Sequence, residues 1–381
     1  MKVPDSVLIL GDKESAIIAS NKLANRTNKK EIEIIIIGRQ PNVEFDDANI
    51  FIPSSLVDHH LLRRSINSVL HTNMEYIQDE VVSLNLKDKS LNTRNGKVVR
   101  YDYLLVTNPV EGDPTSISGF SEDARTLDTV QDSLRLREDL LNIKRGEIVI
   151  YQDGTHSRSP IVGANLAILL ANHFSRNPIY KDVKITYLNS SKVIIENKQF
   201  HARIDNALQN KGVKTTYGFK LEQLNVKNKE LQSKDGSAVK YDIPIIFSPS
   251  RMKDYLLNAG FPRTDSSPIE MNFKNLNVKN YPEVFISSME PLFTSNYWNI
   301  NHVELDYITA KIAHHISGYP DPEDYKGAVY IDYLITEDER ATNIVIENDG
   351  EYSEGKPSKT DYLLKLYSYH SFFGSYSQGF L

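Results

Sequence analysis

Apolar residues at the start of the chain follow a strand pattern and then a helix pattern. Residues 7–10 form an apolar run that ends at Gly11, and small or apolar residues then recur at helical spacing over 16–24. Beyond that helix, residues 31–37 are apolar almost throughout, which is typical of a strand covered by helices on both faces. The order strand, tight turn, helix and strand predicts a βαβ unit of the kind that binds dinucleotides.

The same order of elements returns about 140 residues later. A strand at 147–151 is followed by a polar loop, a helical pattern over 164–174 and another strand at 183–188. Two such units in series favour an α/β fold with two Rossmann-like, doubly wound domains.

Domain boundaries follow from these units and from a late apolar strand at 281–287, which we expect to return to the first domain. We predict a first domain formed by residues 1–110 and 280–320. A second domain of residues 145–250 is inserted into it, and residues 321–381 form a C-terminal α+β region.

Two shorter patterns lie in the first domain. Apolar residues at helical spacing predict a helix over 61–70, and Asn95-Gly96 between two alternating runs predicts a β-hairpin.

Composition is ordinary for a globular protein. The chain has 381 residues, of which 40% are hydrophobic, and its net charge of −6 argues against a nucleic-acid binder. Cysteine is absent, which excludes disulfides, thiolate metal sites and a catalytic thiol. We expect neither a membrane-spanning helix nor a signal peptide, and therefore a protein of the cytoplasm or of the cytoplasmic face of a membrane.

The chemistry of the first turn departs from the dinucleotide-binding fingerprint G-x-G-x-x-G. Gly11 occupies the first glycine position, but Lys13 and Ala16 stand at the second and third. Ala16 is a tolerated replacement, whereas the Lys13 side chain is expected to occupy the space of the phosphates. The second strand ends in Gly38-Arg39 in place of the acidic residue that binds the ribose. Arg39 is either a surface residue or a phosphate contact, and together with Lys13 it leaves open a nucleotide-sensing role.

The whole pattern resembles the two-dinucleotide-domain flavoproteins, which include the pyridine nucleotide-disulfide oxidoreductases. Within them it is most similar to sulfide:quinone oxidoreductases and type II NADH dehydrogenases. The residues that carry the resemblance are the N-terminal turn, 101–107 and 281–286. The resemblance implies an FAD-binding domain in two segments, an inserted NAD-type domain and a C-terminal part that lies on the membrane near a quinone site.

The departures from that family fall on its ligand positions. Its Tyr-Asp-Tyr strand ends in Ala-Thr-Gly, whereas here Val106-Thr107 is followed by Asn108. Its last strand ends in Gly-Asp, whereas here Ser288-Met289 stand there. The cofactor positions that the resemblance implies are therefore altered, and they are Gly11, Lys13, Ala16, Arg39, Asn108 and Met289.

These departures predict a degenerate homologue that binds no cofactor and has no redox chemistry or catalytic residues of its own. It would act as a structural or regulatory subunit of a membrane-associated respiratory or sulfur-oxidising assembly. The alternative is a working FAD-dependent oxidoreductase for NAD(P)H or a quinone, with an atypical cofactor site.

Other polar residues offer weaker candidates. The pairs His59-His60 and His314-His315 are adjacent, so their side chains are expected to diverge, and we predict no metal site. His156, Ser157 and Ser159 lie where the family often has a reactive cysteine, and Ser159 is expected to cap a helix that begins at Pro160.

The C-terminus is rich in aromatic residues from Tyr362 to Phe373. As a helix stripe they pack on the protein's own core or contact a partner. We therefore expect a protein partner or a homo-oligomer, with a possible peripheral membrane contact through this segment and no nucleic acid.

Overall fold

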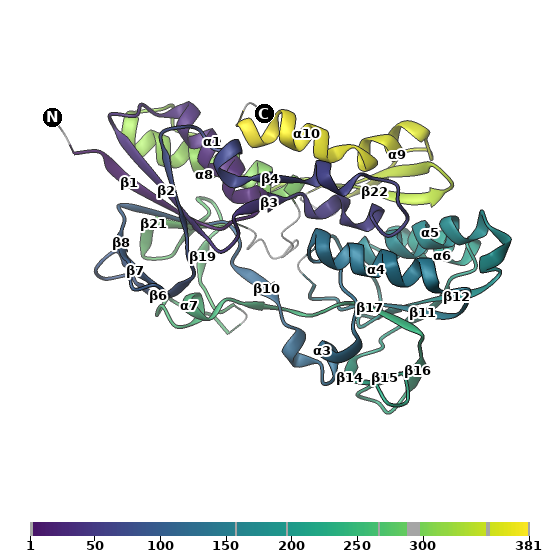
Figure 1. Cartoon of the computed structure of the whole chain (residues 1–381). Helices are drawn as coiled ribbons and strands as arrows, with labels where there is room; N and C mark the ends of the chain where they lie inside the picture. The colour runs from purple at the N-terminus through teal and green to yellow at the C-terminus, as the bar shows by residue number, and fades with distance from the viewer. Residues whose placement is uncertain are drawn as a thin grey trace.

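The computed structural model describes residues 3–156, 158–195, 197–265, 267–287, 298–347 and 351–379. It has the α/β architecture that the sequence predicts (Figure 1). A seven-stranded sheet lies in one half of the molecule, and a four-stranded sheet lies in the other.

The larger sheet is parallel at its centre. Its strand order is β19-β20-β21-β9-β1-β2-β5, and β1 pairs with β2 and β9 on its two sides. The strands are β1 (Asp5–Leu10), β2 (Ile32–Gly38), β5 (Met74–Gln78), β9 (Tyr103–Val106), β19 (Met271–Asn272), β20 (Asn277–Val278) and β21 (Tyr281–Ile286). The late strand β21 pairs in parallel with β9, so residues far apart in the sequence close this sheet. Helices α1 (Glu14–Arg26) and α8 (Trp298–Ser317) pack together beside it.

The second sheet is parallel throughout, with the order β13-β12-β11-β17. Its strands are β11 (Arg145–Gln152), β12 (Asp182–Asn189), β13 (Lys214–Tyr217) and β17 (Ile243–Phe247). Helices α4 (Val130–Asn142), α5 (Val162–Ser175) and α6 (Lys198–Asn210) accompany it (Figure 1).

Each half carries a three-stranded antiparallel sheet. In the first half these strands are β6 (Val81–Asn85), β7 (Ser90–Thr93) and β8 (Val98–Arg100), and the turn between β7 and β8 is the expected hairpin. In the second half they are β14 (Leu221–Asn225), β15 (Glu230–Ser233) and β16 (Ala238–Lys240).

A two-stranded ribbon connects the halves. It consists of β10 (Val110–Gly112), which follows the first sheet, and β18 (Ser250–Met252), which follows the second. Short elements complete both halves. Helix α7 (Asp254–Leu257) packs on β6 of the first half, and α3 (Phe120–Asp123) packs on β14 of the second. The 3-10 turns η3 (Pro114–Ser116) and η4 (Pro178–Tyr180) lie beside α3 and α5.

The predicted helix over 61–70 is wrong. The segment instead contains the end of η2 (His59–Leu62), the strand β4 (Arg63–Ser65) and a single turn, α2 (Ile66–Val69). Strand β4 pairs with β3 (Asn42–Glu44), and η1 (Asp46–Phe51) lies between β3 and η2. The segment's apolar residues are nevertheless buried, as Leu62 and Ile66 show. Tertiary packing has selected 3-10 turns and a strand for a pattern that a helix would also satisfy.

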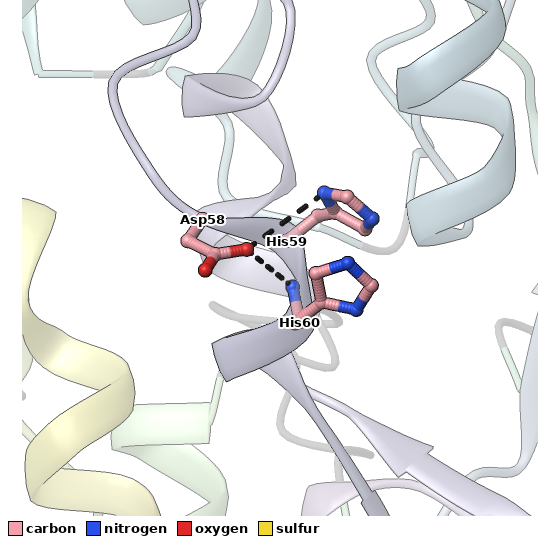
Figure 2. Close-up of side chains that lie close together, drawn as sticks. All are labelled: Asp58, His59 and His60. Atoms are coloured by element: carbon pink, nitrogen blue, oxygen red, sulfur yellow. Dashed lines mark hydrogen bonds and ion pairs between the residues drawn. The ribbon is translucent and has the colours of Figure 1, made fainter.

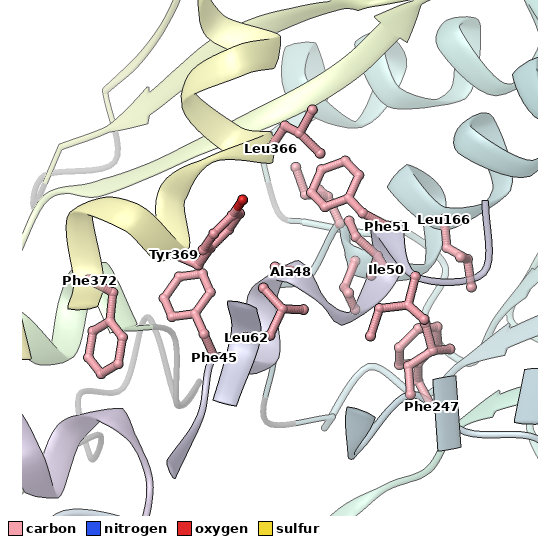
Figure 3. Close-up of a cluster of buried hydrophobic side chains, with 14 of the residues drawn as sticks. Phe45, Ala48, Ile50, Phe51, Leu62, Leu166, Phe247, Leu366, Tyr369 and Phe372 are labelled. Atoms are coloured by element: carbon pink, nitrogen blue, oxygen red, sulfur yellow. The ribbon is translucent and has the colours of Figure 1, made fainter. Parts of the chain in front are cut away.

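The C-terminal region packs on both halves. It contains β22 (Tyr330–Glu337), β23 (Arg340–Ile346), β24 (Tyr352–Glu354), α9 (Lys359–Leu366), α10 (Ser368–Gly374) and η5 (Tyr376–Gln378). Figure 3 shows Leu366, Tyr369 and Phe372 in one apolar cluster with Phe45 and Phe51. The rings of Phe45 and Phe372 stack with their centroids 5.3 Å apart. Much of the aromatic tail therefore packs on the protein's own core.

Candidate functional site

Two neighbouring cavities lie at the carboxyl ends of the central strands of the first sheet. The smaller has a volume of about 270 Å³ and the larger about 560 Å³. Their walls share five residues, Asp12, Arg39, Glu111, Arg251 and Lys253. The carboxyl edge of an open parallel sheet is where such folds bind ligands, and the volumes suit a ligand-binding site.

Gly11 retains the role of the first fingerprint glycine. Its φ of +152° lies at the edge of the region that favours glycine. A Cβ atom there would lie 2.2 Å from Thr107 Oγ1 and 2.8 Å from Asn108 Oδ1. The turn therefore brings the backbone between β1 and α1 directly against the end of β9. Ala16 is fully buried below this turn, where a small side chain lets the helix approach the sheet.

Lys13 and Arg39 both reach the larger cavity. The ammonium of Lys13 is bonded to the Asp46 carboxylate on η1. Burial by itself would lower the pKa of Lys13, but the Asp46 and Glu14 carboxylates raise it above its usual value. Arg39 lies in the wall of both cavities, with its guanidinium 3.7 Å from Glu111. Asn108 also lines the larger cavity, and its Oδ1 accepts a hydrogen bond from Thr107 Oγ1.

Glu14 is the first residue of α1, and its side chain is buried. Burial, and then the charge of Asp46, raise the pKa of Glu14 to about 8. Its Oε1 atom accepts a hydrogen bond from the backbone N–H of Asp46 at 2.8 Å. The first turn of α1 is thus tied to η1 through both Lys13 and Glu14.

An acidic side chain does reach the end of β2, but it comes from the neighbouring turn. Asp12 Oδ2 accepts hydrogen bonds from the backbone N–H groups of Arg39 at 2.6 Å and Gln40 at 3.0 Å. A Cβ atom at Gly38 would lie 2.4 Å from the Cβ atom of Asp12, so Gly38 is needed for this approach. The sequence shows Asp12 beside the fingerprint glycine, but not that its carboxylate replaces the missing acid at the end of β2.

Lys253 is the second site residue that the sequence analysis missed. It follows β18, and its backbone N–H donates to Pro109 O at 3.0 Å. Burial lowers the pKa of its ammonium group to about 8, against the opposing charges of Asp12 and Glu111. Within the described ranges that ammonium makes no hydrogen bond or ion pair, whereas nearby Arg251 pairs with Glu111 and Asp254. Lys253 is thus a basic group in both cavity walls that is free to meet an anion.

The loop after β11 differs from expectation. Helix α5 begins at Val162, not at Pro160, and Ser159 instead donates from its hydroxyl to the buried carboxylate of Asp332 at 2.5 Å. Tyr330 and Lys365 also bond to Asp332, at 3.0 and 2.7 Å. Ser159 therefore belongs to a buried polar network with the C-terminal region. Ser157 and Met289 lie outside the described residues.

His59 and His60 do not diverge as expected. Figure 2 shows their rings side by side, and the ring centroids are 4.0 Å apart. With Asp58 they place one potential ligand atom each within 4.8 Å of one another. Asp58 Oδ1 already accepts from the backbone N–H of His60 at 3.0 Å, as a cap of η2. The cluster lies at the start of the 3-10 turn η2.

Comparison with known proteins identifies the class of fold. No family profile matches the sequence. The mouse mitochondrial sulfide:quinone oxidoreductase is 20% identical over 296 residues, which cover 73% of this chain and 64% of the mouse protein. The chain thus spans less than two thirds of that relative's length.

Solved structures are also similar to this chain over nearly its whole length. The sulfide:quinone oxidoreductase of Aquifex aeolicus has a TM-score of 0.84 at 14% identity, covering 98% of this chain and 92% of that one. A chain of the Tetrahymena thermophila mitochondrial ATP synthase scores 0.77 at 14% identity, covering 99% and 97%. The NDH2 of Plasmodium falciparum, in complex with NADH, scores 0.75 at 12% identity, covering 99% and 96%.

The chain therefore has the fold of the FAD/NAD(P)-binding flavoproteins, as the resemblance implied. Within them it is similar to sulfide:quinone oxidoreductases and NDH2 enzymes.

The expectation that the chain binds no cofactor is wrong. The sulfide:quinone oxidoreductase and NDH2 among these neighbours are FAD-binding oxidoreductases, which points to FAD rather than to an empty scaffold. The physical reason for the error lies in the turn: the backbone path at Gly11 is intact, and Asp12 and Lys253 supply groups that the fingerprint alone does not show. The altered positions by themselves are therefore no evidence that the site is lost.

No helix among the described residues is both long and apolar enough to cross a bilayer.

Proposed function

We propose that this chain is an FAD-dependent oxidoreductase with an atypical cofactor site. The observation that carries the proposal is the pair of cavities that meet at the β1–α1 turn, with the Gly11 turn preserved between them. Bound FAD would supply the hydride and electron chemistry, and the chain's own residues would bind and orient it.

Two side chains and the larger cavity suit the three parts of FAD. The Asp12 carboxylate at the end of β2 suits ribose hydroxyls, which donate hydrogen bonds. The ammonium of Lys253, where the two cavities meet, suits a pyrophosphate. The larger cavity, between the ribbon and the loop after β11, suits the flavin ring.

We propose a quinone as the electron acceptor of this flavin, and the second domain disfavours a nicotinamide dinucleotide as its electron donor. At the β11–α5 turn, where the second domain would bind a dinucleotide, the side chain of Gln152 fills the position. Its Oε1 accepts from the Gly163 backbone N–H at 3.0 Å, and its Nε2 donates to Ser159 O at 3.2 Å. The helix N-terminal N–H that a phosphate would use is therefore already bonded. The chain also holds no cysteine, so a thiol cannot relay electrons to the flavin.

Binding and redox measurements test this proposal. FAD titration followed by flavin fluorescence quenching should show saturable binding, and Lys253→Met should weaken it about tenfold or more. Lys240→Met, which removes an exposed lysine on the antiparallel sheet of the second half, is the matched control and should bind FAD as the wild type does. A soluble quinone should reoxidise the chemically reduced flavoprotein. Rapid anaerobic bleaching of the flavin by NADH would contradict the exclusion of a nicotinamide donor, and a reduced flavin that no quinone reoxidises would contradict the quinone acceptor.

A peripheral contact with a membrane or a partner is part of this proposal. Leu363 and Leu364 on α9 and Tyr367 directly after it are exposed, at 37%, 51% and 46% of their surface. Apolar groups on one exposed turn suit an interface with lipid or protein. Vesicle sedimentation tests the lipid contact: Leu364→Asp should reduce pelleting, whereas Leu141→Asp on exposed α4 should not.

A second candidate function is that of a subunit in a larger assembly. The chain of the Tetrahymena ATP synthase, similar over nearly the whole length, supports it. In that role the flavin would be held without turnover. Quinone reduction by the isolated chain would contradict this candidate and leave the first one standing.

A further inference from the structure

His156 is a buried side chain of the larger cavity that no role assigned above uses. It lies in the loop between β11 and α5 and lines the cavity together with Arg158 and Ser248. Only 9% of its surface is exposed, and its ring packs edge-on against Phe247 with centroids 5.3 Å apart.

The protonation state of the His156 ring follows from the hydrogen bond that its Nδ1 atom makes. Its Nδ1 atom lies 2.7 Å from the backbone oxygen of Ser248. A carbonyl oxygen only accepts, so Nδ1 carries the hydrogen. Burial lowers the pKa of His156 to about 4, so the ring is neutral at physiological pH and its Nε2 atom presents a lone pair.

This lone pair has no donor in the protein. Nε2 is buried without a hydrogen-bond partner in the described part of the chain. The nearest cations bond elsewhere. The Nη1 and Nη2 atoms of Arg158 donate to the backbone oxygens of Leu127 and Asp46, and Lys13 is bonded to the Asp46 carboxylate. The Nε–H of Arg158 is a buried donor without a partner among the described residues, and it makes no hydrogen bond to His156. Buried acceptors are nearly always satisfied, so an orphan acceptor in a cavity wall indicates a ligand that brings a donor.

We propose that His156 Nε2 accepts a hydrogen bond from a ring N–H of the ligand held in the larger cavity. This inference rests on the proposed function, and it specifies the ligand group: N3–H is the only ring N–H of an oxidised flavin. His156 is then a flavin-binding residue that contacts the pyrimidine edge of the ring. A ligand edge made only of carbonyl groups would face the lone pair of Nε2 and be disfavoured.

Two variants separate the two nitrogen atoms of the ring. His156→Asn keeps a donor near the position of Nδ1 and removes the acceptor at Nε2. His156→Gln places an amide oxygen near the position of Nε2. The probes are FAD and FAD methylated at N3, which lacks the donor, and dissociation constants are measured by fluorescence quenching.

The wild type should bind FAD about three- to tenfold more tightly than N3-methyl FAD, the range expected for one hydrogen bond. His156→Asn should lose this preference, and His156→Gln should keep it. Because the preference is a difference between two ligands on one protein, a uniform loss of stability or affinity does not imitate it. Urea unfolding of both variants confirms that they are folded.

The outcomes distinguish this inference from the proposed function. If the wild type binds both flavins equally, or if His156→Asn keeps the preference, the inference is overturned while FAD binding stands. If the wild type binds neither flavin, the proposed function fails, and the inference fails with it.

Discussion

At the scale of single residues, Gly38 shows how a fingerprint can mislead. The absence of an acid at the end of β2 suggested a lost ribose contact, yet Asp12 brings its carboxylate to that place. We therefore predict that Gly38→Glu weakens FAD binding, because its Cβ atom would meet Asp12 at 2.4 Å. FAD titration checks this, with Gly374→Glu as the control that adds an acid on α10, where a Cβ atom meets nothing within 4 Å. Tighter binding by Gly38→Glu would mean that an acid is required there after all.

Glu14 carries the second residue-scale prediction, which concerns pH. Its pKa of about 8 in the folded protein lies above its ordinary value of 4.5. Below pH 4.5 the group is protonated in both states, so its contribution to stability is fully present. As the pH rises toward 8 the unfolded chain releases this proton first, and stability falls. Glu14→Gln should remove up to about 1.4 kcal/mol per pH unit of this slope. Urea unfolding at a series of pH values measures it, and parallel curves for the two proteins would contradict the assignment.

At the scale of elements, the ion pair between Lys365 on α9 and Asp332 on β22 holds the C-terminal helix α9 against that strand. The Asp332 carboxylate is fully buried, and burial alone would raise its pKa, but Lys365 and Ser159 hold the pKa below its usual range. Lys365→Met should therefore destabilise the fold by about 3–5 kcal/mol, since it leaves a buried charge unpaired. Adding Asp332→Asn should restore much of that loss. If the double variant is as unstable as the single one in urea unfolding, the cost comes from packing and not from charge.

Elements also show what the sequence could and could not predict. The apolar runs of β1, β2 and β11 predict these parallel strands, because a strand that is covered by helices on both faces needs apolar side chains on both faces. The segment 61–70 could not be predicted, since burial of Leu62 and Ile66 is equally compatible with a helix or with short turns. Lys253 could not be found, because only the fold brings the ends of β18 and β11 to one cavity. His156 is a candidate in the sequence through its place in the loop after β11, but its place in the cavity wall comes from the fold.

At the scale of the whole molecule, the two halves are joined by the β10–β18 ribbon and by the apolar cluster of Figure 3. The boundaries predicted for the domains, 1–110 with 280–320 and 145–250, stay a proposal that limited proteolysis can test. The cavities lie along this junction, so cofactor binding should join the two halves and raise their resistance to unfolding.

FAD binding is the central claim, and flavin content measures it most directly. The visible absorption spectrum of the purified protein gives the ratio of flavin to chain, and titration of flavin-free protein with FAD gives the affinity. We expect a yellow protein, or saturable binding of one FAD per chain that stabilises the protein against urea. A colourless protein whose fluorescence titration and unfolding curve are both unchanged by FAD would contradict it.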